Sequence, residues 1–160
     1  MNSADMTAKM AEGNGFIAAL DQSGGSTPKA LLGYGIAESE YDGDEAMFGL
    51  IHAMRARIIS TPSFASGKVI GAILFERTMD GEVGGVPTPA ALIARGVVPF
   101  IKIDKGLEEE ANGVQLMKPM PELDALLTRA KAPGVYGTKE RSVINSANRE
   151  GIAGIVKQPS

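Results

Sequence analysis

The sequence contains no cysteine and no tryptophan, and His52 is its only histidine. Without cysteine there is no disulfide framework and no thiolate nucleophile. A single histidine gives no paired ligand spacing, so we expect no metal site. The aromatic content of 5% leaves few rings for stacking bases, which argues against a nucleic-acid partner.

Long apolar runs and a strong charge of either sign are also missing. No run is long enough to span a bilayer, and the N-terminus has no basic region followed by an apolar segment. The net charge of −3 is small and of the wrong sign for general nucleic-acid binding. We therefore expect a cytoplasmic protein without membrane or nucleic-acid partners, folded as one domain over residues 1–160.

Four short apolar runs divide the chain, and the first three are almost continuous in apolar residues. Such runs are typical of strands that are buried on both faces of a parallel sheet. The fourth run is less apolar, and we expect a strand there mainly because of its place in the alternation of apolar runs and helical segments. The runs span residues 16–21, 69–76, 97–104 and 135–141.

The segments between these runs have helical patterns. Met47, Ile51 and Met54 fall on one stripe at helical spacing. A threonine followed by proline opens two other segments, so Thr27 and Thr88 are expected to be N-caps. Strands that alternate with helices predict an α/β domain with a parallel sheet. The expected helices span residues 27–35, 44–60, 88–96, 120–134 and 141–151.

Charged residues stand at the C-terminal end of every expected strand. That end of a parallel sheet is where α/β proteins bind ligands. Because side chains alternate along a strand, Lys102 and Asp104 should share a face, as should Lys139 and Arg141. The charged residues are Asp21, Glu76 with Arg77, Lys102 with Asp104, and Lys139 with Arg141.

The stretch "DQSGGS", residues 21–26, has two readings. Its glycines let the backbone approach a ligand, Ser23 and Ser26 offer hydroxyls, and a helix start follows, which together suit a phosphate. It also fits an ordinary strand-to-helix turn. The pattern alone favours the turn, because it is neither a Walker loop nor G-x-G-x-x-G.

Each charged candidate also has a catalytic and a structural interpretation. Asp21 could act as a general acid or base, or it could form a turn. Lys102 and Lys139 could reach into a pocket, where a desolvated lysine can attack a carbonyl, or they could lie on edge strands with their ammonium groups in solvent. Arg141 could hold a phosphate, or it could lie in water.

Five stretches together resemble one family. They are "GFIAALDQSGGSTPKAL", "MRARIISTPSF", "IGAILFERTMD", "GVVPFIKIDKGLEEEANGVQLMKP" and "GTKERS", and they extend from about residue 10 to about residue 151. In this order they resemble the N-terminal part of the single-chain bacterial class I fructose-bisphosphate aldolases. The resemblance implies an α/β fold of the (β/α)₈ TIM-barrel family, a cytoplasmic glycolytic lyase, a lysine Schiff base without metal or cofactor, and a sugar-phosphate substrate.

The resemblance also implies roles for residues that match the family's motifs. Asp21 matches the acid beside the Schiff-base lysine, which acts in carbon–carbon cleavage, and Lys139 matches a lysine at the middle of the substrate; these two are the catalytic candidates. Four residues are the substrate-binding candidates, and they match groups near the distal phosphate or the distal end of the substrate. These are Ser23, Ser26, Lys102 and Arg141.

One departure from the family is large, because its glutamate acid/base and its Schiff-base lysine lie on later strands that have no counterpart here. We therefore expect residues 1–160 to be the N-terminal half of the barrel, about four β/α units, from a truncated gene product or part of a longer chain. Alone, they should be inactive, and they should associate with themselves or need a C-terminal half.

The inner face of the sheet would then lack its neighbours. We expect this exposed inner face to include Ile17, Ala19, Ala72, Leu74 and Phe100. Two other functions stay open. One is another lysine-dependent aldolase with Lys139 as its nucleophile, and the other is a non-catalytic half-barrel that binds phosphate.

Overall fold

The computed structural model, which describes residues 1–158, confirms the parallel sheet. Its strands are β1 (Phe16–Leu20), β2 (Val69–Leu74), β5 (Val98–Lys102) and β7 (Gly137–Lys139), and they lie side by side in chain order. All three neighbouring pairs are parallel. Because crossovers between parallel strands are right-handed, a sheet in this order carries its crossover helices on one face. Barrel walls are built in this way, whereas doubly wound sheets change direction.

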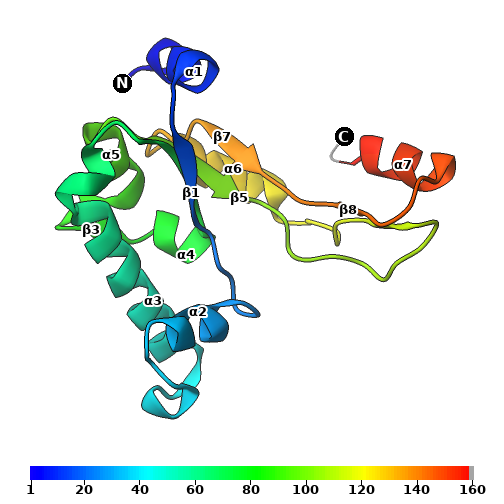
Figure 1. The fold of residues 1–160 in the computed structure, drawn as a ribbon, viewed down its shortest axis with the longest axis horizontal. Helices are drawn as coiled ribbons and strands as arrows, with labels where there is room; N and C mark the ends of the chain where they lie inside the picture. The colour runs from blue at the N-terminus through cyan, green and yellow to red at the C-terminus, as the bar shows by residue number, and fades with distance from the viewer. Residues whose placement is uncertain (159–160) are drawn as a thin grey trace.

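The remaining elements connect these strands or extend from them. Helix α1 lies at the start of β1, and α2 lies beyond its end (Figure 1). Two 3₁₀ turns, Glu38–Glu40 and Pro62–Ala65, flank the long helix α3. The helices are α1 (Ser3–Glu12), α2 (Thr27–Gly33), α3 (Gly43–Ser60), α4 (Glu76–Met79), α5 (Thr88–Ala94), α6 (Leu123–Lys131) and α7 (Arg149–Val156), and the short strands are β3 (Glu82–Val83), β4 (Val86–Pro87), β6 (Val114–Gln115) and β8 (Val143–Ile144).

The main core lies between the sheet and helices α3 to α6. Ala72 and Leu74 are fully buried in this core, where they pack with residues of those helices such as Leu92 and Leu126. The expectation that Ala72 and Leu74 face a barrel interior is therefore wrong. Because side chains alternate along a strand, Gly71 lies on the other face of the sheet. Ile17 of β1 pairs with Gly71 and therefore lies on that face too.

The opposite face of the sheet is only partly covered. Ile17 is 43% exposed and Ala19 is exposed, so the prediction that β1 is buried on both faces is wrong. The ring of Phe100 spreads over this face, because a Cβ added at Gly71 or Gly137 would lie 3.2 Å or 3.1 Å from it. The glycines on the two neighbouring strands give the ring its room.

An arm extends from the C-terminal ends of β5 and β7 (Figure 1). Strand β6, which follows β5, pairs antiparallel with β8, which follows β7. The Asn145 amide donates to the Glu110 carboxylate at 2.6 Å, and the Gln158 side chain binds both the N–H and the C=O of Met117 at 2.9 Å. Strand pairing and side-chain hydrogen bonds thus join the segments that follow β5 and β7.

The prediction of a helix over residues 141–151 is wrong. Residues 143 and 144 form β8, and the helix begins at Arg149, with the Asn148 side chain accepting from the Gly151 N–H at 3.0 Å. Gly151 lies inside α7, where an added Cβ would be 2.3 Å from the Asn112 carbonyl oxygen. The glycine therefore permits close packing of α7 against Asn112 and Val114 and does not end a helix.

The prediction that Thr27 and Thr88 are N-caps is also wrong. Both threonines are the first residues inside their helices, and the caps are Ser26 and Pro87, whose side chains make no capping bond. The fully buried hydroxyls instead donate backwards, from Thr27 to the Ser23 carbonyl at 3.0 Å and from Thr88 to the Gly81 carbonyl at 2.9 Å. They tie each helix start to the loop before it.

Candidate active site

The two catalytic and four substrate-binding candidates line one cavity. This cavity has a volume of about 310 Å³ and lies at the C-terminal ends of β1, β5 and β7. Gln22, Gly25 and Gly106 complete its lining. The six are Asp21, Ser23, Ser26, Lys102, Lys139 and Arg141.

A chain of opposite charges connects the C-terminal ends of β1, β5 and β7 at this cavity. The Lys139 ammonium lies 3.2 Å from an oxygen of Asp21 and 3.6 Å from an oxygen of Asp104. The second oxygen of Asp104 lies 3.6 Å from the Lys102 ammonium. The Asp104 side chain is only 2% exposed, so these contacts are poorly screened by water.

The "DQSGGS" loop presents one hydroxyl to this network. Lys102 Nζ donates to Ser23 Oγ at 3.3 Å, which links the loop after β1 to the end of β5. Ser26 Oγ turns inward, since it accepts from the Ser23 N–H at 3.2 Å and donates to the Ser23 carbonyl at 3.3 Å. An added Cβ at Gly25 would meet no atom within 4 Å, so the loop backbone is open to the cavity. The cations beside the Ser23 hydroxyl and the open Gly25 form an arrangement that can bind an anion.

Arg55 on α3 hydrogen-bonds to Gln22 of this loop, a role that the sequence analysis did not predict. Its fully buried guanidinium donates to Thr78 Oγ1 at 2.6 Å, to the Gln22 carbonyl at 2.8 Å and to Gln22 Oε1 at 3.0 Å. Burial lowers the pKa of Arg55 to about 10, and the charge of Asp21 opposes that shift. The available signal was an arginine one turn from Ile51 on the apolar stripe, because a buried arginine needs polar partners.

Glu76 and Arg77 are also predicted at the C-terminal ends of the strands, but neither lines this cavity. Glu76 pairs with Lys105 at 2.9 Å and with Arg129, and Arg129 also binds Asp80 at 3.1 Å. The hydrogen bond from Lys105 is the main cause that lowers the pKa of Glu76, against the effect of burial, and Arg129 adds to it. This second cluster joins α4 to α6, so its role is structural.

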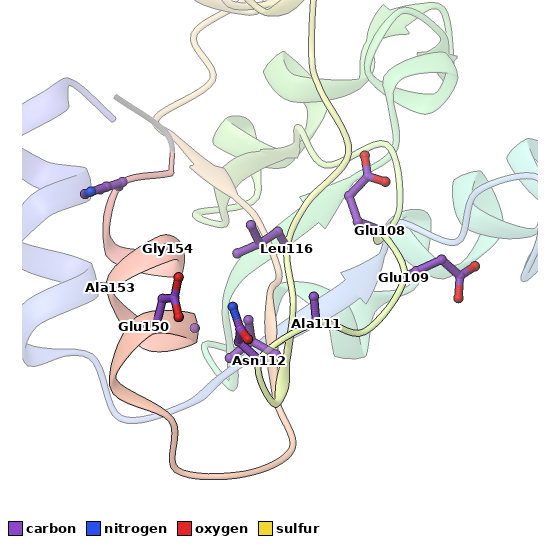
Figure 2. A pocket seen from close by; sticks show the side chains of 11 residues that line it. Glu108, Glu109, Ala111, Asn112, Leu116, Glu150, Ala153 and Gly154 are labelled. Atoms are coloured by element: carbon purple, nitrogen blue, oxygen red, sulfur yellow. The ribbon is translucent and has the colours of Figure 1, made fainter.

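A roomier cavity of about 430 Å³ lies in the arm, away from these residues. Figure 2 shows Glu150 on α7 and Glu108 and Glu109 on the segment before β6, with the Glu109 side chain pointing away from α7. The charged residues that line this roomier cavity are three glutamates and Lys157, whereas Lys102, Lys139, Arg141 and Asp21 line the smaller cavity at the strand ends, so the smaller cavity suits an anion better.

Within residues 1–158, no group of three or more histidine, cysteine or carboxylate residues could hold a metal ion. The same residues contain no helix with the length and apolar character needed to cross a membrane.

The fold and the site define a β/α protein that has paired lysines and carboxylates at the C-terminal ends of a parallel sheet. No protein-family model matches the chain. Over 151 residues, 94% of the chain, it is 58% identical to "Fructose-bisphosphate aldolase class 1" of Porphyromonas gingivalis. The chain spans about half of that relative, 52% of its length. The resemblance to class I fructose-bisphosphate aldolases is confirmed.

A solved structure agrees with this fold. The chain superposes with a TM-score of 0.68 on fructose-bisphosphate aldolase from Plasmodium falciparum, which was crystallised in complex with TRAP and a small-molecule inhibitor. The superposition covers 87% of this chain and 38% of that protein, at 22% sequence identity. This similarity supports the aldolase fold of the sheet and its helices.

Proposed function

We propose that residues 1–160 form the first four β/α units of an eight-unit barrel and supply part of the active site of a class I fructose-bisphosphate aldolase. The observation that carries this proposal is the Asp21–Lys139–Asp104–Lys102 network beside the Ser23 hydroxyl. A sheet wound in chain order, with one face only partly covered, supports the barrel.

The proposed reaction is the reversible cleavage of fructose 1,6-bisphosphate to dihydroxyacetone phosphate and glyceraldehyde 3-phosphate, in the cytoplasm. A neutral lysine amine attacks the ketone, and uptake of one proton with loss of water gives an iminium. Loss of the C4 hydroxyl proton breaks the C3–C4 bond, and the iminium takes up the electron pair as an enamine. Protonation and hydrolysis then release the second product.

Each site residue receives a role in this proposal. Asp21 serves proton transfer in carbon–carbon cleavage, and Lys139 stabilises charge at the middle of the substrate. Lys102 and Arg141 neutralise the distal phosphate and Ser23 offers it a hydroxyl, while the Ser26 hydroxyl would first have to leave its bonds to the Ser23 backbone. The Schiff-base lysine would come from a later strand, as the resemblance implies.

Lys139 as the nucleophile is the weaker alternative. Its ammonium forms ion pairs with two carboxylates, at 3.2 Å and 3.6 Å. Such contacts involve a charged ammonium, whereas attack on a carbonyl requires the neutral amine. The geometry therefore suits electrostatic stabilisation better.

A hybrid enzyme tests the proposal. It joins residues 1–158 of this chain to the part of the Porphyromonas gingivalis relative that the match leaves out. We expect aldolase activity from the hybrid, and borohydride reduction with the ketose phosphate should trap a lysine outside residues 1–158. Trapping on Lys139 would establish the other lysine-dependent aldolase, and phosphate binding without cleavage would favour the non-catalytic half-barrel.

Residues 1–160 expressed by themselves provide a second test. The exposed Ile17 and the unpaired edges of β1 and β7 should cause self-association, and cleavage should be absent. Adding a separately expressed C-terminal half should restore cleavage. Full activity of residues 1–160 alone would contradict the proposal.

A further inference from the structure

Asp104 is the most deeply buried carboxylate in the charge network at the cavity. It follows the end of β5 by two residues, and its side chain is 2% exposed, against 13% for Asp21. A buried carboxylate is costly unless partners compensate its charge. Asp104 Oδ2 has no hydrogen-bond partner within residues 1–158. The two lysines are therefore its main compensation.

The geometry around Asp104 is symmetrical. Each carboxylate oxygen faces one ammonium, Oδ1 toward Lys102 and Oδ2 toward Lys139, and both separations are 3.6 Å. These distances exceed those of direct hydrogen bonds. The lysines thus keep their closer contacts for other groups, Lys102 for Ser23 Oγ at 3.3 Å and Lys139 for Asp21 at 3.2 Å.

The charges around the cavity depend on Asp104. Lys102, Lys139 and Arg141 contribute three positive charges, and Asp21 and Asp104 contribute two negative charges. Without Asp104 the surplus of positive charge would double. An arriving anion would then find both lysines free of their shared carboxylate and could draw Lys139 away from Asp21.

We propose that Asp104 is a positioning residue that holds the two lysines to separate tasks. It keeps Lys102 at the anion end and Lys139 at the Asp21 end, and it limits the affinity of the site for anions. The proposal deepens the aldolase function and rests on it, because these tasks matter only if an anion and a reacting carbon occupy the two ends.

Binding of inorganic phosphate to the 160-residue chain tests the charge part of this proposal. Asp104→Asn should bind phosphate about three- to tenfold more tightly in calorimetric titrations, since it removes a nearby negative charge. Asp104→Glu keeps the charge and should bind within about twofold of the wild type. Asp124→Asn on the exposed surface of α6 is the matched control and should change nothing. Unchanged or weaker binding by Asp104→Asn overturns the proposal, as does a wild-type chain that binds no phosphate.

Steady-state kinetics of the hybrid enzyme test the positioning part. Asp104→Asn should lower kcat at least about tenfold while KM stays unchanged or falls. Asp104→Glu should lower kcat with KM unchanged, because its longer side chain moves the carboxylate from the midpoint. A residue needed only for folding would lower the melting temperature and leave kcat per folded enzyme intact, and that result overturns the proposal. An inactive wild-type hybrid counts against the aldolase function, while the phosphate titration still decides the role of Asp104 in anion binding.

Discussion

The Lys139 ammonium lies 3.2 Å from the Asp21 carboxylate, and this ion pair joins the ends of the two outermost strands of the sheet. Strands β2 and β5 lie between them, so a flat sheet would separate β1 and β7 by roughly 14 Å. Both side chains must therefore lean over the same face of the sheet. Residues that are 118 positions apart in the chain thereby form one site.

Replacement of Asp21 by asparagine should abolish cleavage in the hybrid enzyme without unfolding it. The amide keeps the shape of the side chain, but it cannot accept a proton, so we expect kcat to fall by about 10² to 10⁴. A coupled aldolase assay measures the change, and circular dichroism checks the fold. Asp44→Asn, at an exposed position of α3, is the control. Near-normal turnover of Asp21→Asn would remove the catalytic role.

Replacement of Lys102 by methionine should weaken the binding of sugar bisphosphate. The loss of one charge-assisted contact costs about 1.5–3 kcal/mol, and the dissociation constant should rise accordingly. Lys68→Met is the control, because the exposed Lys68 lies just before β2, at the opposite end of the sheet. Calorimetry of the hybrid enzyme compares the two variants. Equal affinities would place the phosphate elsewhere.

The cluster around Glu76 should make stability depend on pH. The pKa of Glu76 is lowered in the folded protein, so its ion pairs stabilise the fold above the unfolded pKa of roughly 4.3, and that contribution is lost as the pH falls through the folded value. In urea unfolding at pH 7, Glu76→Gln should cost about 0.5–1 kcal/mol, a cost that should shrink toward pH 3.

A double-mutant cycle provides the control for this pH effect. In a Lys105→Met background the same Glu76→Gln substitution should cost less at pH 7, because the main hydrogen-bonding partner is already gone. A cost that does not change with pH, or with Lys105, would show that the cluster adds nothing to stability.

Two glycine substitutions should change stability in opposite directions. An added Cβ at Gly81 would lie 2.5 Å from the ring of His52, whose Nε2 is 2.9 Å from the Glu82 carbonyl oxygen. Gly81→Ala should therefore cost about 1–3 kcal/mol. Gly49→Ala in α3 meets no atom within 4 Å and should stabilise by about 0.5–1 kcal/mol. Thermal melts that shift both variants in the same direction would contradict this expectation.

Much of the local structure could be predicted because its signals are local. The apolar runs located β1, β2, β5 and β7, and the stripe of Met47, Ile51 and Met54 located α3. Glycine and threonine gave wrong predictions at the ends of helices. Gly151 serves a contact with Asn112, and Thr27 and Thr88 bind backwards into loops, and none of these partners is visible from spacing along the chain.

The sequence by itself determined the order of strands and helices, the charged residues at the strand ends and the resemblance to class I fructose-bisphosphate aldolases. Only the tertiary structure decided which of those charges meet. Asp21, Lys102 and Lys139 share the cavity, whereas Glu76 pairs with Lys105 and Arg129 outside its lining. The tertiary structure also placed Arg55 against the Gln22 carbonyl and Asp104 between two lysines. The reason is that strand pairing and register fix which side chains lie near each other, and pairing between distant segments leaves no local mark in the sequence.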